Sequence, residues 1–194
     1  MNNLIYTIQG LRTWARKLDR VNNHTPCHSE NVANYALEIC KALNIRGKKK
    51  DIIITACLIH DIGKIGIEAR IWAKKEKLTD AEWLKIKMHP VISARLVKEA
   101  GFDKEIIETI YYHHVWFNGT GYPDNGDKKR NKIPVGARIM AVCDAYEAMI
   151  SSRPYRETIS REEAIEELRR CSAKQFDPRV VEAFIQVLGI KKVI

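Results

Sequence analysis

One segment limits strongly what this chain can fold into. Residues 51–61 read Asp-Ile-Ile-Ile-Thr-Ala-Cys-Leu-Ile-His-Asp and are apolar on almost every side of a helix. A helix that is apolar all round is buried, as in the centre of a bundle. Amphipathic periodicity surrounds it, and Val32, Ala36 and Ile39 form one stripe at helical spacing. Because no segment alternates apolar and polar residues for long, the sequence predicts an all-α fold, a single helical bundle.

Local signals mark where the helices begin and where the chain is irregular. Thr79 with Glu82, and Ser160 with Glu163, match the capping box that satisfies free amides at a helix start. The one long irregular stretch, from about 118 to 132, is rich in Gly, Asn, Asp and Lys. We therefore expect one long irregular loop in the bundle.

The N-terminal residues predict an additional helix. Apolar residues recur at helical spacing in residues 1–20; they are Leu4, Ile8, Leu11, Ala15 and Leu18. At 194 residues the chain has room for one domain. We therefore divide it into an accessory helix (1–22) and the main domain (23–194). The helix either packs on the bundle or mediates a homodimer.

Composition excludes several classes of protein. The apolar fraction of 45% and charged fraction of 29% are ordinary for a globular protein. The start of the chain does not resemble a signal peptide, and no apolar run could span a bilayer. The five cysteines form no CxxC pair, which indicates reduced thiols and a cytoplasmic location. The net charge of +9 suits an anionic partner such as a phosphate ester, but predicts neither specific nucleic-acid binding nor membrane binding.

Histidines and aspartates interrupt the apolar helical faces. These residues are His28, His60, Asp61, His89, His113, His114 and Asp144. Each alone has an ordinary explanation: a satisfied core histidine, a chance His-Asp pair, or an aspartate facing an arginine. Together they form a nitrogen and oxygen donor set suited to two adjacent first-row ions, without the cysteines that a structural zinc site uses.

The order of these residues resembles a known family. His28, His60-Asp61 and Asp144 are similar to the H…HD…D signature of the HD phosphohydrolase superfamily. Further blocks resemble its HD-GYP family in order across residues 25–184; they are 58–67 (Leu-Ile-His-Asp-Ile-Gly-Lys-Ile-Gly-Ile), Met88-His-Pro90, His113-His114, Gly119-Thr-Gly-Tyr-Pro123, 137–146, 152–156 (Ser-Arg-Pro-Tyr-Arg) and Phe176-Asp-Pro178.

The resemblance implies two divalent metal ions, Fe or Mn; a third ion is possible but not expected. One ion would be held by His28, His60, Asp61 and Asp144. Asp61 would bridge to the second ion, held by His89, His113 and His114. His24 stands where members with three metals carry a glutamate, which makes it a candidate outer ligand.

The resemblance also implies the reaction, hydrolysis of cyclic di-GMP by a metal-bridging hydroxide, either to linear pGpG or onward to GMP. Asp61 and Lys64 would be the catalytic residues, with Lys64 at the scissile phosphate. Arg153 and Arg156 would bind the substrate near its second phosphate, although both could be ordinary surface arginines.

The loop with Gly121, Tyr122 and Pro123 is expected to shape the site and to contact a protein partner. A plain turn would explain its glycine and proline equally well. This chain departs from the family at Val115 and Asn118, where acidic residues are frequent, so the anchoring of the loop is in question.

Three alternatives stay open. The chain could hydrolyse another cyclic dinucleotide or a nucleotide, it could be a non-catalytic HD-GYP binding or signalling module, or it could be a di-iron oxygenase. The complete ligand set argues against the non-catalytic module. Lys64 and the Gly-Tyr-Pro block favour phosphate chemistry over an oxygenase.

Overall fold

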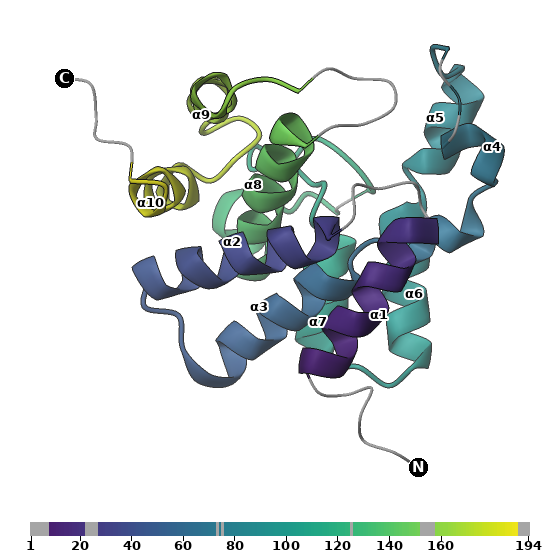
Figure 1. The fold of residues 1–194 in the computed structure, drawn as a ribbon, viewed down its shortest axis with the longest axis horizontal. Helices are drawn as coiled ribbons and strands as arrows, with labels where there is room; N and C mark the ends of the chain where they lie inside the picture. Colours follow the sequence, from purple (N-terminus) through teal and green to yellow (C-terminus); the bar gives the residue numbers. More distant parts are fainter. Residues whose placement is uncertain are drawn as a thin grey trace.

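The protein is helical throughout the part that its structure, a computed structural model, describes: residues 8–21, 27–72, 74, 76–124, 126–151 and 158–189. These residues form ten α-helices, two short 3-10 helices and no β-strand (Figure 1). The α-helices are α1 (Ile8–Val21), α2 (His28–Ala42), α3 (Gly47–Ile59), α4 (Ala69–Trp72), α5 (Asp80–Ile86), α6 (His89–Glu99), α7 (Lys104–Tyr111), α8 (Val135–Ile150), α9 (Arg161–Arg170) and α10 (Pro178–Val187). The 3-10 helices are η1 (Ile62–Gly66) and η2 (Arg130–Lys132). The all-α prediction is confirmed.

Helix α3 forms the centre of the bundle. It contacts α1, α2, α7 and α8, so neighbours surround its apolar surface. Ile53, Leu58 and Ile59 are among the largest fully buried side chains. Burying a side chain of this size contributes roughly 1.5–3 kcal/mol. The prediction of a central buried helix is confirmed, and its last turn delivers His60 and Asp61 into the interior.

Helix α8 is joined to α10 by a buried ion pair. The Arg138 guanidinium donates to the Asp177 carboxylate, which also accepts the Arg179 N–H at the start of α10 (2.9 Å). A charge of this kind is buried only when it is paired. In Figure 1, α9 and α10 lie on the opposite side of the bundle from α4 and α5.

Helix α1 packs on the bundle, which is one of the two alternatives predicted for the N-terminal helix. Leu11 and Ala15 belong to the main apolar core. The buried Asp19 carboxylate accepts hydrogen bonds from Ser29, from the backbone N–H (3.1 Å) and from the hydroxyl (2.7 Å). Cys27, which precedes α2, makes no side-chain capping bond, so α1 supplies the cap of α2. Dimerisation through this helix stays a prediction.

The helix boundaries follow the local signals. Thr79 and Ser160 both complete their capping boxes. Between α7 and α8 the described chain is irregular apart from η2. The backbone amides of Phe117 and Asn118 donate hydrogen bonds to the segment that connects α9 to α10, and these bonds attach the irregular stretch to the bundle. No helix of the described residues is long and apolar enough to cross a membrane.

Candidate metal centre

The seven predicted ligands come together in the interior, from five different elements. They are His28 at the start of α2, His60 and Asp61 at the end of α3, His89 at the start of α6, His113 and His114 after α7, and Asp144 within α8. Helix ends position most of them, because a chain that leaves a helix can direct a polar side chain inward without interrupting an apolar face.

One group of ligands joins α2, α3 and α8. The ligating atoms of His28, His60 and Asp144 all lie within 4.8 Å of one another. The Asp144 Oδ1 atom is 3.3 Å from His28 Nε2 and 4.0 Å from His60 Nε2. This is the first ligand set that the family resemblance implied, apart from the bridging Asp61.

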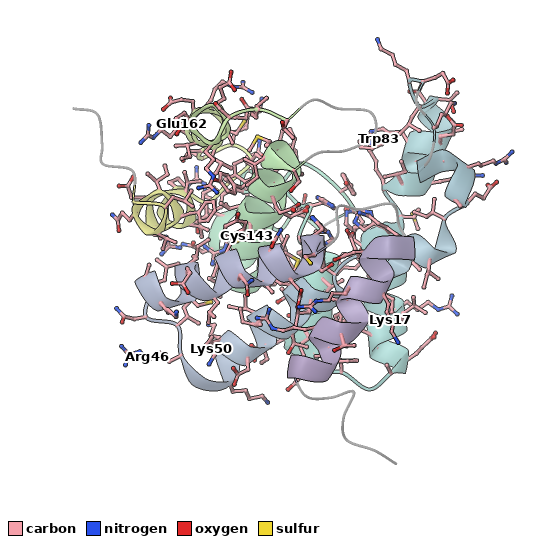
Figure 2. All side chains as sticks on the ribbon, viewed as in Figure 1. Lys17, Arg46, Lys50, Trp83, Cys143 and Glu162 are labelled. Carbon is pink, nitrogen blue, oxygen red and sulfur yellow. The ribbon has the colours of Figure 1, made fainter. Side chains whose placement is uncertain are left out.

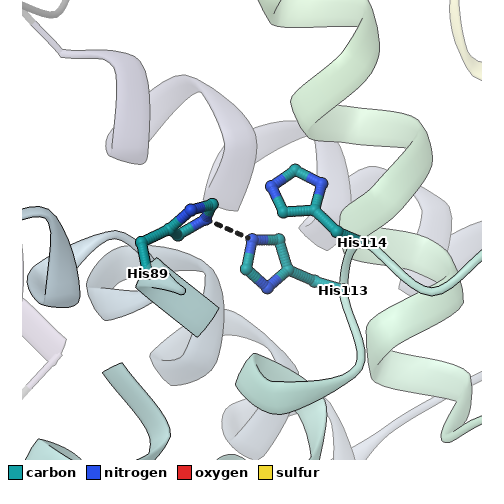
Figure 3. A group of neighbouring side chains, drawn as sticks. All are labelled: His89, His113 and His114. Atoms are coloured by element: carbon teal, nitrogen blue, oxygen red, sulfur yellow. Dashed lines mark hydrogen bonds between the residues drawn. The ribbon is translucent and has the colours of Figure 1, made fainter. Parts of the chain in front are cut away.

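A second group joins α6 to the segment after α7. The side chains of His89, His113 and His114 point toward one another (Figure 3). The Nε2 atoms of His89 and His113 are 3.3 Å apart. Two imidazole nitrogens at that distance, directed at one point, can share a cation.

Asp61 lies between the two groups, and each of its oxygens faces one of them. Oδ2 is 3.3 Å from His60 Nε2 and 3.7 Å from His28 Nε2, whereas Oδ1 is 3.4 Å from His89 Nε2. His60, Asp61 and His113 also form a third cluster that connects the groups. A carboxylate in this position can serve two cations at once.

The backbone sets the orientation of the imidazole rings. Nδ1 bonds to the backbone carbonyl three residues earlier at 2.8 Å for His60, 2.9 Å for His89 and 2.5 Å for His113. Each ring therefore presents Nε2 to the centre, an arrangement typical of metal ligands. Within the described residues the buried His60 Nε2 makes no hydrogen bond, as expected of an atom that a cation would satisfy.

Glu147 supports His28 in a different way. Its buried carboxylate is hydrogen-bonded to His28 Nδ1 and to the Ser151 hydroxyl (2.6 Å), and Asn31 Nδ2 is 3.4 Å away. Burial acts to raise the pKa of Glu147, but the hydrogen bond with His28 outweighs it and the pKa is lowered. Sequence reasoning missed this residue. The available signal was a second carboxylate one helical turn after Asp144 in an apolar helix.

The protonation states differ between the two groups. Burial lowers the pKa of His89 to about 3 and that of His113 to about 4, and it lowers the pKa of His114 well below its ordinary value. These rings are therefore neutral, the form that binds a metal. For His28 burial acts in the same direction, but the Asp144 and Glu147 carboxylates outweigh it and raise the pKa to about 9.

Lys64 lies in the centre and is largely buried, which does not fit a surface lysine. Its Nζ atom is 2.5 Å from Asp61 Oδ2. The 3-10 helix η1 produces this contact, because its turn brings residue 64 back over residue 61, with the Lys64 N–H bonded to the Asp61 carbonyl at 3.0 Å. An ammonium group here can contact a phosphate oxygen next to the ligands.

The Gly-Tyr-Pro segment covers His114. Gly121 has φ +94°, and a Cβ atom there would lie 2.4 Å from the His114 carbonyl oxygen. The Tyr122 N–H bonds that same carbonyl at 3.2 Å, and the Tyr122 ring lies 4.7 Å from the His114 ring. Pro123 follows in a cis peptide. The segment is therefore a wall of the second group, and glycine is required at 121 by its conformation and by the close approach.

The two departures from the family pattern keep this loop anchored. The Asn118 side-chain oxygen accepts from the Thr120 N–H (3.0 Å) and hydroxyl (2.8 Å), as an aspartate would. Val115 is buried and pairs with Gly121 through an isolated antiparallel bridge. Three further predicted residues, His24, Arg153 and Arg156, lie outside the described residues, so their roles stay predictions.

The donor set fits divalent metal ions. It combines five imidazoles, which bind a metal in their deprotonated form, with two carboxylates, and all of these are hard or borderline donors. Asp61 connects the two groups, since its oxygens are 3.3 Å from His60 Nε2 and 3.4 Å from His89 Nε2. The cysteines of the chain are all free thiols, and none belongs to a ligand group.

Comparison with known proteins places the centre in context. A family model described as HD domain matches residues 12–180. The chain is 36% identical over 165 residues to a protein of Thermotoga maritima named cyclic di-GMP phosphodiesterase, covering 82% of this chain and 44% of that protein. It is 32% identical to the cyclic di-GMP phosphodiesterase response regulator RpfG of Xanthomonas campestris pv. campestris, covering 89% of this chain and 46% of that protein. The chain thus spans less than half the length of these curated relatives.

Solved structures share the fold. A cyclic GMP-AMP specific phosphodiesterase of V. cholerae superimposes with a TM-score of 0.74 at 18% identity, over 95% of this chain and 49% of that one. The HD domain of the L. monocytogenes phosphodiesterase PgpH in complex with cyclic-di-AMP gives a TM-score of 0.60 at 19% identity, over 95% and 98% of the two chains.

Proposed function

This chain belongs to the HD domain family, and from that premise we propose that it is a metal-dependent phosphodiesterase that hydrolyses cyclic di-GMP. The position of Asp61 carries the proposal, since its two oxygens face two separate groups of histidines. In addition, the Lys64 ammonium contacts one of these two oxygens, Oδ2. Relatives that are 36% and 32% identical to this chain over the aligned regions are named for that activity. Water would add to phosphorus and the bond to one ribose oxygen would break, giving linear pGpG and, after a second cleavage, GMP.

The ligand groups divide the work among this chain's residues. One cation would be held by His28, His60 and Asp144. The other would be held by His89, His113 and His114, and Asp61 would bind both cations. Two adjacent divalent ions lower the pKa of a water and neutralise the phosphate charge when bound. Lys64 would neutralise a phosphate oxygen next to Asp61. Glu147 would hold the His28 ring with its Nε2 directed inward.

Several parts of the proposal extend beyond these residues. We propose two ions, Fe or Mn, with His24 as an outer ligand only, and a cytoplasmic location. Arg153 and Arg156 would bind the second phosphate. The surface of the Gly121-Tyr122-Pro123 segment would contact a protein partner, and the N-terminal helix would form a homodimer contact.

A second candidate substrate is 3′3′-cGAMP. A V. cholerae relative named 3′3′-cGAMP-specific phosphodiesterase 3 is 30% identical to this chain over 175 residues, a value near that of the cyclic di-GMP enzymes. Both substrates have two phosphodiester bonds in the same ring, so the metal centre would treat them alike. The residues that contact the bases would decide between them.

The test uses the purified protein after its metal content has been measured. Cyclic di-GMP, 3′3′-cGAMP and bis(p-nitrophenyl) phosphate are incubated separately, and the products are separated by chromatography. We expect cyclic di-GMP to be converted to pGpG fastest, and EDTA to stop the reaction. Asp144→Asn, which keeps the size of the side chain but removes its charge, is the control for contaminating enzymes. A folded, metal-loaded protein that cleaves none of the three would refute the proposal.

A further inference from the structure

Exposed apolar side chains gather on the two segments that deliver Lys64 and His89. The exposed large hydrophobic residues of the described chain are Ile65, Trp83, Leu84 and Met88. Ile65 follows Lys64, and the other three lie on α5 or in the turn that leads from it to His89. Trp83 is 43% exposed, so its ring is accessible to a ligand.

A series of aromatic rings leads from the metal ligands to this surface. The Tyr122 ring is 4.7 Å from the His114 ring and 6.3 Å from the His89 ring, between centroids. The Trp83 ring is 6.4 Å from the Tyr122 ring, at an interplanar angle of 69°. Figure 2 shows Trp83 on the side of α5 that is nearer to the rest of the molecule. Trp83 is therefore two ring contacts away from a ligand of the second group.

A cation accompanies the two outer rings. Lys87 Nζ lies 5.7 Å from the centroid of the Trp83 ring and 6.0 Å from that of Tyr122. It belongs to the turn after α5, four residues beyond Trp83 and two before His89. Tryptophan and tyrosine rings with a lysine ammonium beside them favour a ligand that is flat, aromatic and joined to an anion.

We propose that Trp83, Tyr122 and Lys87 form a subsite for the purine base next to the scissile phosphate, a proposal that rests on the proposed function. The base stacks on the Trp83 or Tyr122 ring, and the Lys87 ammonium neutralises the adjoining phosphate. A base is the fitting occupant because the rings continue directly from the metal ligands, and in a nucleotide the base is separated from its phosphate by a single ribose. A protein segment would not need the ammonium group beside the rings.

The test measures binding separately from turnover. The affinity of cyclic di-GMP for the EDTA-treated protein is determined by calorimetry for the wild type, Trp83→Ala, Trp83→Phe and Leu84→Ala. Stacking on one aromatic side chain contributes enough that Trp83→Ala should raise Kd by about 10-fold or more. Phenylalanine keeps a ring face, so Trp83→Phe should retain most of the affinity. Leu84, the next residue on α5, is 63% exposed and is the control, with an unchanged Kd expected.

The outcomes separate this proposal from the proposed function. An unchanged Kd in Trp83→Ala overturns the subsite, even if the enzyme hydrolyses cyclic di-GMP. An equal loss of affinity in Leu84→Ala also overturns it, since the effect would then come from the packing of α5. If wild-type protein binds the dinucleotide through Trp83 but does not cleave it when metal is supplied, the subsite stands and the proposed function fails.

Discussion

Gly63 lies where the 3-10 helix η1 meets α6, and replacing it by alanine tests how closely the two must approach. Its N–H donates to the Ser93 hydroxyl at 2.8 Å. A Cβ atom at residue 63 would lie 2.3 Å from the His89 carbonyl oxygen, 2.5 Å from the Ser93 amide nitrogen and 2.7 Å from its hydroxyl oxygen. Two of these three atoms are backbone, so no change of rotamer removes the overlap, and Gly63→Ala should force α6 away from η1.

The size of the effect follows from the geometry. A carbon atom approaches a carbonyl oxygen no closer than about 3.3 Å, so the start of α6 would have to retreat by roughly 1 Å. Overpacking costs about 1–3 kcal/mol, and the stretched bond from the Gly63 amide about 1 kcal/mol more. The free energy of unfolding should fall by about 2–4 kcal/mol, which lowers the melting temperature by about 4–16 °C in a domain of this size. His89 moves with α6, away from Asp61 and His113, so bound metal should be lost as well.

The assay combines thermal denaturation followed by circular dichroism with metal analysis of the same preparation. Gly66→Ala is the matched control, because it lies in the same 3-10 helix and its Cβ atom would be 3.4 Å from two Ile92 side-chain carbons, an ordinary contact. If Gly63→Ala melts within about 2 °C of Gly66→Ala and keeps its metal, α6 can yield without cost and the reasoning is wrong.

Three further substitutions separate the roles in the centre. Asp61→Ala should abolish turnover and release much of both metals, since the carboxylate faces both histidine groups; metal analysis that shows two ions per chain would contradict this. Lys64→Ala should leave metal content unchanged while raising the barrier to hydrolysis of cyclic di-GMP by about 2–4 kcal/mol. Lys85 lies on the exposed surface, so the Lys85→Ala control should hydrolyse cyclic di-GMP at the wild-type rate. Glu147→Ala should weaken metal binding by about 10–100-fold in a chelator competition, because the His28 ring loses the partner of its Nδ1 atom. Glu147→Gln, which keeps the size and an acceptor oxygen, should lose less, and equal losses in the two variants would indicate that the carboxylate charge, not the hydrogen bond, supports His28.

Much of the fold could be predicted from the sequence because its signals are local. The apolar run 51–61 predicts a buried helix whatever surrounds it, and the capping boxes at Thr79 and Ser160 depend only on residues three positions away. The proposed metal ligands were also conspicuous, because imidazoles and carboxylates are costly on apolar faces and their order resembles the HD-GYP family. That family resemblance is confirmed.

The parts of the fold and site that could not be predicted depend on which distant segments pack together, and a single sequence does not show these long-range contacts. Glu147 was not predicted as a support for His28, because the two are 119 positions apart and only the crossing of α2 and α8 brings them together. The role of Gly63 likewise depends on how closely α6 passes. The Gly121 segment was predicted to shape the site and to contact a partner, with a plain turn as the alternative, and the structure adds that it packs on His114.

The hydrogen bonds from Ser29 to Asp19 have a consequence for how the domain unfolds. Ser29 is adjacent to His28, so the Asp19 carboxylate of α1 caps the same turn of α2 that carries the first proposed metal ligand. Melting of α1 would withdraw the cap and two core side chains at once, so α1 and α2 should exchange their amide protons as one cooperative unit. A protein shortened to begin after residue 22 would then have a frayed first turn of α2, and it would lose affinity for the first ion before it lost its overall helicity.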